Sequence, residues 1–173
     1  MNTSTLTLDF FQQTLEDQAW TRLSKKFTWS EQLLEKYQDK VDWEEISSNT
    51  EVLWTTSLLE RFKKRLNWSK LSEMDRAVHY FTTQNLEQFK DYWDWHKLSK
   101  NESFIPTFEL LEKYADKWDW EKIINRGYIH YKPEDFIMHF EKYIPINKLQ
   151  NSNLWNNLVR NKTYELIDKL VNS

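Results

Sequence analysis

The segment SEQLLEKYQDKVDWEEIS, residues 30–47, contains a pattern that returns along most of the chain. In its last six residues a Trp is followed three positions later by an apolar residue, and we call this the Trp motif. The copies are AWTRLS (Ala19–Ser24), DWEEIS (Asp42–Ser47), NWSKLS (Asn67–Ser72), DWHKLS (Asp94–Ser99) and DWEKII (Asp119–Ile124), with YIPINKLQ (Tyr143–Gln150) as a worn sixth copy that carries Ile146 in place of Trp. The Trp positions and Ile146 lie 23 to 27 residues apart, and a period of this length indicates tandem structural repeats.

A second motif stands directly before each Trp motif after the first. Its copies align without a gap: SEQLLEKYQDKV (Ser30–Val41), TTSLLERFKKRL (Thr55–Leu66), TTQNLEQFKDYW (Thr82–Trp93), TFELLEKYADKW (Thr107–Trp118) and PEDFIMHFEKYI (Pro133–Ile144). Leu34, Tyr37 and Val41 are spaced by three and four residues, which is typical of one face of an α-helix. The leading Ser or Thr is placed to cap the helix, and Pro suits the first turn. We therefore expect a helix of about three turns over residues 31–41 and in each equivalent copy.

The Trp motif itself predicts a shorter helix. Asp or Asn precedes Trp in four copies, where it would cap the helix N-terminus. Asp42 and Glu45 have the spacing of a capping box, with Asp in place of Ser or Thr. Trp43 and Ile46 share one face. The aromatic residues just before the longer helices are expected to act as hydrophobic staples; these are Trp29, Trp54 and Phe81.

These two helices predict the fold class. Neither can bury its aromatic side chains alone, and helices of this length are marginal in water without neighbours. If the Trp of one helix packs on the Tyr or Phe of the next, both are buried, as in an α-solenoid. The prediction is an all-α, right-handed α-solenoid of about six two-helix units of roughly 25 residues. It forms one cooperative domain over residues 1–173, with an N-terminal cap unit at 1–19, regular repeats at 20–145 and an irregular C-terminal cap at 146–173.

The composition excludes several classes of protein. The absence of Cys rules out disulfides, thiolate metal sites and Cys nucleophiles, and a single Gly cannot build a P-loop or a dinucleotide fingerprint. The net charge of −3 gives no reason to expect nucleic acid or an anionic membrane as partner. No apolar run is long enough for a membrane span, and the start MNTSTLTLDF lacks the features of a secretory signal. The expectation is a soluble cytoplasmic protein.

The sequence resembles a group of bacterial and large-virus proteins built from tandem units that contain Trp-Asp-Trp. The resemblance is carried by DKWDW (Asp116–Trp120), DYWDW (Asp91–Trp95), DKVDW (Asp39–Trp43), the Trp-Thr step at Trp54-Thr55 and the similar Trp29-Ser30. It covers roughly residues 20–145 and implies a repeat architecture. It transfers no catalytic residue.

Residues that could carry chemistry repeat with the unit, which favours structural roles. The repeated Trp residues could form a stacking surface for sugars or bases, but their fixed register favours core packing. The four His residues, His79, His96, His130 and His139, lack the spacing of a metal site. No catalytic residue, metal or cofactor is predicted. The basic cluster Arg61, Lys63, Lys64 and Arg65 is either a solvated helix face or a contact for an acidic partner or a phosphate backbone.

Two linkers depart from the template of the repeat. The linker at residues 72–81 carries Arg76 and His79, and the linker at residues 125–133 carries the only Gly of the chain. We expect Gly127 to adopt a positive φ after the short helix. Residues private to one unit are candidates for binding a partner, and drift in a loop is the alternative. The candidate partner-binding residues are Arg76, His79, Arg126, Tyr128, His130 and Tyr131.

The functional prediction follows from the architecture. A stack of repeats offers a long surface whose contacts can change unit by unit. The first hypothesis is a non-enzymatic protein–protein interaction module, such as an adaptor, a scaffold or an immunity-type inhibitor, whose partner is another protein. The alternative is a nucleic-acid- or nucleotide-binding helical repeat protein, which would need a basic stripe that the charge balance does not favour. No sequence motif supports an enzyme.

Overall fold

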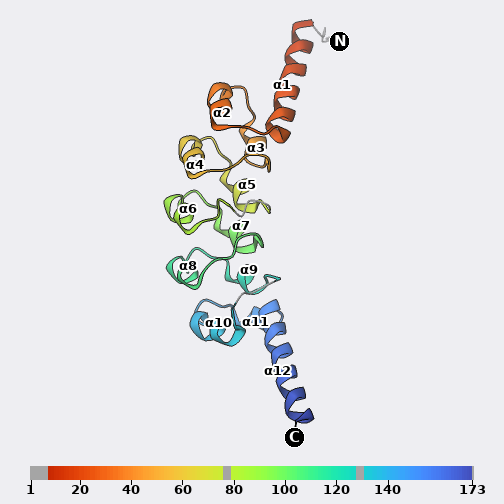
Figure 1. Ribbon diagram of the computed structural model, residues 1–173, viewed down its shortest axis with the longest axis vertical. Helices are drawn as coiled ribbons and strands as arrows, with labels where there is room; N and C mark the ends of the chain where they lie inside the picture. The colour runs from red at the N-terminus through yellow and green to blue at the C-terminus, as the bar shows by residue number, and fades with distance from the viewer. Residues whose placement is uncertain (1–7, 76–78, 128–130, 173) are drawn as a thin grey trace, which may run out of the picture. The chain divides into compact units, whose positions relative to one another are not determined.

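The computed structural model of the chain describes residues 8–75, 79–127 and 131–172, and every regular element in these residues is an α-helix (Figure 1). This confirms the all-α class for the described residues. The chain divides into two compact units, Met1–Tyr92 and Trp93–Ser173, and each is described by itself. The first unit holds α1 (Leu8–Lys26), α2 (Glu31–Tyr37), α3 (Trp43–Ile46), α4 (Thr56–Phe62), α5 (Trp68–Glu73) and α6 (Thr83–Gln88). The second holds α7 (Trp95–Lys100), α8 (Phe108–Lys113), α9 (Trp120–Ile124), α10 (Pro133–Phe140), α11 (Ile146–Leu149) and α12 (Asn153–Val171).

The helices of the second motif begin at the predicted caps. The hydroxyl groups of Ser30, Thr55, Thr82 and Thr107 each accept a hydrogen bond from the backbone N–H three residues ahead, at 3.1–3.2 Å. Each bond satisfies one of the N–H groups that a helix leaves without an internal partner. Pro133 takes the first-turn position of α10, as predicted.

The same helices end earlier than the sequence indicates. α2 and α4 have seven residues each, which is about two turns rather than three. The indole N–H of Trp43 donates to the carbonyl of Gln38 at 2.9 Å, and that of Trp68 donates to Lys63 at 2.8 Å. Both carbonyls belong to the residues that follow the last helical turn. Each Trp therefore satisfies a backbone carbonyl that the helix end leaves open.

Of the two hydrogen bonds expected for a capping box at Asp42, one forms and the other does not. The Asp42 side chain caps α3 by accepting from the backbone N–H of Glu44 and Glu45. The other half of the box, a bond from Glu45 back to the Asp42 N–H, is replaced by a contact between helices. The Asp42 N–H donates to Ser24 Oγ at 2.9 Å, and Glu45 Oε2 lies 3.3 Å from Lys25 Nζ. Both bonds tie α3 to α1.

Every Trp of the Trp motif packs on a ring of the helix that follows it, which confirms this part of the prediction. In the first unit the ring pairs are Trp20–Tyr37, Trp43–Phe62 and Trp68–Phe89, with centroids 4.8–5.4 Å apart. In the second unit they are Trp95–Tyr114 and Trp120–Phe140, at 4.9 and 5.1 Å. All five pairs have interplanar angles of 38–42°. The recurrent spacing in sequence therefore produces a recurrent packing geometry.

A second neighbour determines how far each Trp is buried. The guanidinium of Arg65 lies 5.9 Å from the ring centroid of Trp43, which stays partly exposed. The ring of Tyr92 lies 5.1 Å from that of Trp68, which is only 7% exposed. A cation over an indole ring leaves more of the ring near water than a second aromatic ring does.

The two terminal helices differ from the predicted caps. α1 and α12 have 19 residues each, and α1 runs through the predicted boundary between residues 19 and 20. α12 joins into one helix the two segments LWNNL and TYELIDKL, which resemble the two motifs. Ile146, which replaces Trp in the worn sixth copy, is 80% exposed and does not take the packing role of Trp. None of the described helices has the length and apolarity of a membrane span.

Candidate interaction surfaces

Arg126, one of the predicted partner-binding residues, lies inside the second unit. It is 7% exposed, and its guanidinium donates to the backbone carbonyls of Asn101 and Phe104. Burial lowers the pKa of Arg126, and the nearby Glu102 carboxylate opposes this shift. The buried Arg126 side chain therefore connects its own linker to the linker that contains Asn101 and Phe104, and it is not exposed on a surface.

A comparison with Asn49 explains why Arg126 departs from the template. Asn49 is 1% exposed, and its side-chain amide donates to the carbonyls of Ser24 and Phe27 at 2.8 and 2.9 Å. These acceptors lie 25 and 22 residues before Asn49, and the acceptors of Arg126 lie 25 and 22 residues before it. Arg126 therefore makes with a guanidinium the same pair of contacts that Asn49 makes with an amide.

Tyr131 and Gly127 continue the same linker. The Tyr131 hydroxyl donates to the carbonyl of Pro106 at 2.7 Å, and burial raises its pKa. The expected positive φ of Gly127 is wrong, because no described residue has a positive φ. The backbone N–H of Gly127 instead donates to Glu102 Oε1 at 2.9 Å. This linker is held to the preceding one through side chains on both.

The remaining predicted site residues do not form a cluster that the structure describes. Arg76, Tyr128 and His130 lie outside the described residues. His79 is exposed in the first unit, and its ring centroid lies 5.6 Å from that of Tyr80 in an edge-to-face arrangement. Of the three candidates that the structure describes, Arg126 and Tyr131 are brought together, and both bind backbone carbonyls of residues 101–106.

The serine that ends the Trp motif connects successive copies at Ser24, Ser47 and Ser99, a role that the sequence pattern did not predict. Ser47 donates to the carbonyl of Trp43 at 2.6 Å and accepts from the N–H of Asn67 at 2.8 Å, so it connects α3 to the start of α5. Ser24 and Ser99 make the same two bonds in their own units. The repetition of Ser at this position of the Trp motif is the sequence signal for this connection.

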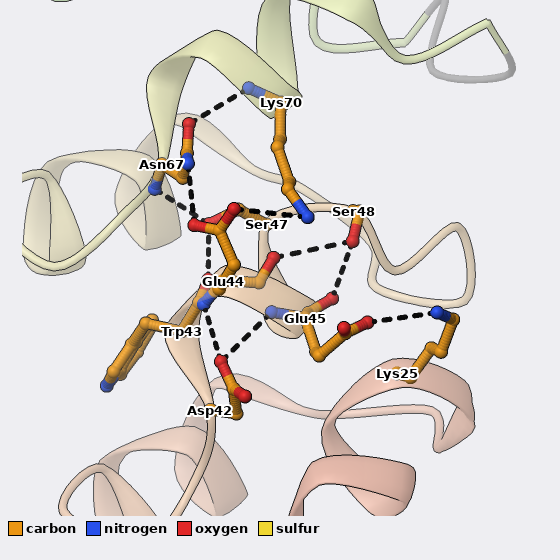
Figure 2. A network of polar contacts seen from close by, with 9 residues as sticks. All are labelled: Lys25, Asp42, Trp43, Glu44, Glu45, Ser47, Ser48, Asn67 and Lys70. Atoms are coloured by element: carbon orange, nitrogen blue, oxygen red, sulfur yellow. Dashed lines mark hydrogen bonds and ion pairs between the residues drawn. The ribbon is translucent and has the colours of Figure 1, made fainter.

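Polar side chains extend this connection on one side of the first unit. Figure 2 shows Glu44 of α3 between Asn67 and Lys70 of the next copy. Asn67 Nδ2 donates to Glu44 Oε2 at 2.6 Å, and Lys70 Nζ lies 3.1 Å from Glu44 Oε1. Together with the Lys25–Glu45 pair, these contacts join α1, α3 and α5.

The basic cluster of α4 is paired with carboxylates. Arg61 lies 3.2 Å from Glu31 and 2.7 Å from Glu35 of α2, Arg65 lies 2.9 Å from Asp39, and Lys63 pairs with Glu60. These contacts neutralise most of the cluster and connect neighbouring copies. The geometry is that of a solvated, ion-paired helix face, and it does not favour a phosphate contact.

An exposed apolar surface lies on α1, which extends beyond the other helices of the first unit (Figure 1). Leu8, Phe10, Phe11 and Leu15 are 70, 61, 53 and 52% exposed. Towards the other end of α1, residues of α1, of α2 and of the segment between them line an open hollow of about 260 Å³; they are Trp20, Leu23, Phe27, Trp29, Leu33 and Tyr37. We call these residues together the α1 face. Contiguous exposed apolar surface marks interaction sites more often than scattered apolar residues do.

A comparable set of exposed apolar residues lies on the second terminal helix. They are Val159, Tyr164, Leu166, Ile167, Leu170 and Val171 of α12.

Across the described residues, no group of three or more His, Asp or Glu side chains is arranged to hold a metal ion. No protein-family model, curated protein or solved structure matches the chain.

Proposed function

We propose that this chain is a non-enzymatic protein–protein interaction module, built as a right-handed α-solenoid of about six two-helix units. The five Trp–ring pairs with one common geometry support the repeat. The serine connections at Ser24, Ser47 and Ser99 support it independently, because they use a different side chain at a different position of the unit.

The single observation that carries the functional proposal is the α1 face. Residues 8–19 are exposed apart from the partly exposed Thr14, although they include Leu8, Phe10, Phe11 and Leu15. Leaving these apolar side chains in water costs free energy that a partner would recover on binding. The repeated Ser and Asp residues support the non-enzymatic part, since they act as helix caps and as connections between copies.

Affinity capture with matched variants tests this proposal. Leu15 and Leu166 are the same residue type, stand on α1 and α12, and are 52 and 51% exposed. Tagged wild-type, Leu15→Asp and Leu166→Asp chains are used as bait in cells that produce the protein naturally. We expect a stoichiometric protein with the wild-type and Leu166→Asp baits that is lost with Leu15→Asp, and that binds again when both purified proteins are mixed. If no captured protein depends on Leu15, the α1 face is not an interaction surface.

A further inference from the structure

We infer that the partner of the α1 face is a second copy of this chain, bound through an antiparallel pairing of the two α1 helices. The inference rests on the proposed function and names the partner of that surface. Three properties of α1 carry it: the spacing of its exposed apolar residues, the distribution of its charges, and the position of the hollow along the helix.

Five of the apolar residues of α1 form a stripe along one side of the helix. Leu8, Phe11, Leu15, Ala19 and Leu23 are spaced by three or four residues, so they lie on one side of the helix, and all five are exposed. A stripe with this spacing is the surface that two packed helices bury against one another. Because the stripe spans most of α1, an equally long helix would cover it best; α1 and α12 of a second copy both have that length, and the charges and the hollow described next favour α1.

The charges of α1 favour one orientation of this pairing. The acidic residues Asp9, Glu16 and Asp17 stand in its first half, and the basic residues Arg22, Lys25 and Lys26 stand at its end. In an antiparallel pair centred on the stripe, Asp9 in the first turn of each helix lies level with Arg22 near the basic end of the other. Glu16 and Asp17 stay near the centre of the pair, where Glu16 is already bound to Lys40 of its own chain at 3.2 Å. A parallel pair would place like charges together at both ends.

The hollow lies where an antiparallel partner would reach it. It is formed at the end of α1 by residues from Trp20 to Phe27, together with residues of α2. In an antiparallel pair centred on the stripe, Leu8 of one copy faces Leu23 of the other, at the edge of the hollow. Each copy then offers apolar residues from the start of α1 and receives those of its partner, which is the self-complementarity that a two-fold interface needs. At about 260 Å³ the hollow is also smaller than most small-molecule sites, which span roughly 300–1,000 Å³.

The first experiment measures the mass of the full chain by analytical ultracentrifugation over a wide range of concentration. We expect a reversible monomer–dimer equilibrium for the wild type and for Leu166→Asp, and a dimer dissociation constant at least about tenfold higher for Leu15→Asp. Circular dichroism melts of the three proteins distinguish a variant that has lost its fold from a folded variant that no longer dimerises. A wild type that stays monomeric throughout, or a dimer that depends on Leu166 and not on Leu15, overturns the inference.

A second experiment tests the orientation. The chain has no Cys, so single Cys variants can be joined at one known position with a short bismaleimide linker. A mixture of Leu8→Cys and Leu23→Cys chains should give cross-linked pairs in high yield, and Leu8→Cys alone should give few. A high yield from Leu8→Cys alone would contradict the antiparallel arrangement. A monomeric chain that still captures a different, Leu15-dependent protein would overturn the self-pairing and leave the proposed function intact.

Discussion

The first unit contains two kinds of helix, and they solve the problem of burying apolar residues in opposite ways (Figure 1). α3, α4 and α5 have four, seven and six residues, too few for a stable isolated helix, and they depend on contacts with neighbouring copies. α1 has 19 residues and begins with turns that leave Leu8, Phe11 and Leu15 exposed. The short helices follow the rule of the repeat, whereas α1 departs from it. The departure is the basis of the proposed binding surface, and the contacts between the short helices hold the unit together.

The largest effect is expected from removing a buried Trp among the short helices. Trp68 is 7% exposed and contacts the rings of Phe89 and Tyr92. Trp68→Ala should lower the free energy of unfolding by about 3–5 kcal/mol, because it leaves a cavity and removes an indole hydrogen bond. Leu53→Ala is the control, because Leu53 is 69% exposed and lies outside the α1 face, and it should change stability by less than about 0.5 kcal/mol. Urea titrations of both variants provide the measurement, and a loss below about 1 kcal/mol for Trp68→Ala would contradict the importance of the ring pairs.

A smaller effect is expected from breaking a serine connection. In Ser47→Ala the N–H of Asn67 loses its acceptor, and we expect a loss of about 1–3 kcal/mol. Ser48→Ala is a matched control at the next position. The Ser48 hydroxyl bonds only to carbonyls of its own turn, at 3.2 and 3.4 Å, so its loss should cost less than about 0.5 kcal/mol. Equal melting temperatures for the two variants would show that the connection between copies adds no stability.

The regular part of the fold could be predicted from the sequence because its signals are local and repeated. The N-caps and the Trp–ring contacts follow from residues at fixed spacing, and repetition separates them from chance. The helix lengths could not be predicted in the same way. α2 ends at Tyr37 because the carbonyl of Gln38 is bound by Trp43, and the apolar pattern up to Val41 carries no sign of this bond.

The candidate site was harder to predict, because a residue that differs from the repeat template can still make the same contacts as the template residue. Arg126 attracted attention as a departure from the template, yet it repeats the two backbone contacts of Asn49. The α1 face was missed for the opposite reason. Leu8, Phe11 and Leu15 have the spacing of a buried helix face, and only the structure shows that nothing described in the first unit covers them.

A third prediction concerns Tyr80, which anchors the linker between α5 and α6. Its ring is fully buried, and its hydroxyl donates to the carbonyl of Leu71 at 2.8 Å. Tyr80→Phe should cost about 0.5–1.5 kcal/mol near neutral pH. Burial raises the pKa of Tyr80 above that of an unfolded tyrosine, so the unfolded chain releases this proton first. The stability that Tyr80 confers is therefore complete below about pH 10 and falls at higher pH.

The pH dependence separates Tyr80 from the other groups that titrate in base. Comparing urea midpoints of the wild type and Tyr80→Phe from neutral pH upward isolates the contribution of this hydroxyl. The stability of the wild type should fall more steeply than that of the variant above about pH 10. Parallel curves would mean that the Tyr80 hydroxyl reaches water more easily than its burial indicates.

The smallest effect is expected at Gly127, where the sequence predicted the strongest backbone constraint. Its φ is not positive, and a Cβ built there would lie 3.8 Å from Glu102 Oε1, an ordinary contact distance. Gly127→Ala should therefore leave the free energy of unfolding unchanged or raise it by up to about 1 kcal/mol, because alanine restricts the unfolded chain. Glu102→Gln is a useful companion, since it removes the charge but keeps an acceptor for the Gly127 N–H. Thermal melts could instead show that Gly127→Ala lowers the free energy of unfolding by more than about 1 kcal/mol while Glu102→Gln does not. This linker would then depend on its glycine, which would contradict the ordinary contact distance at Gly127.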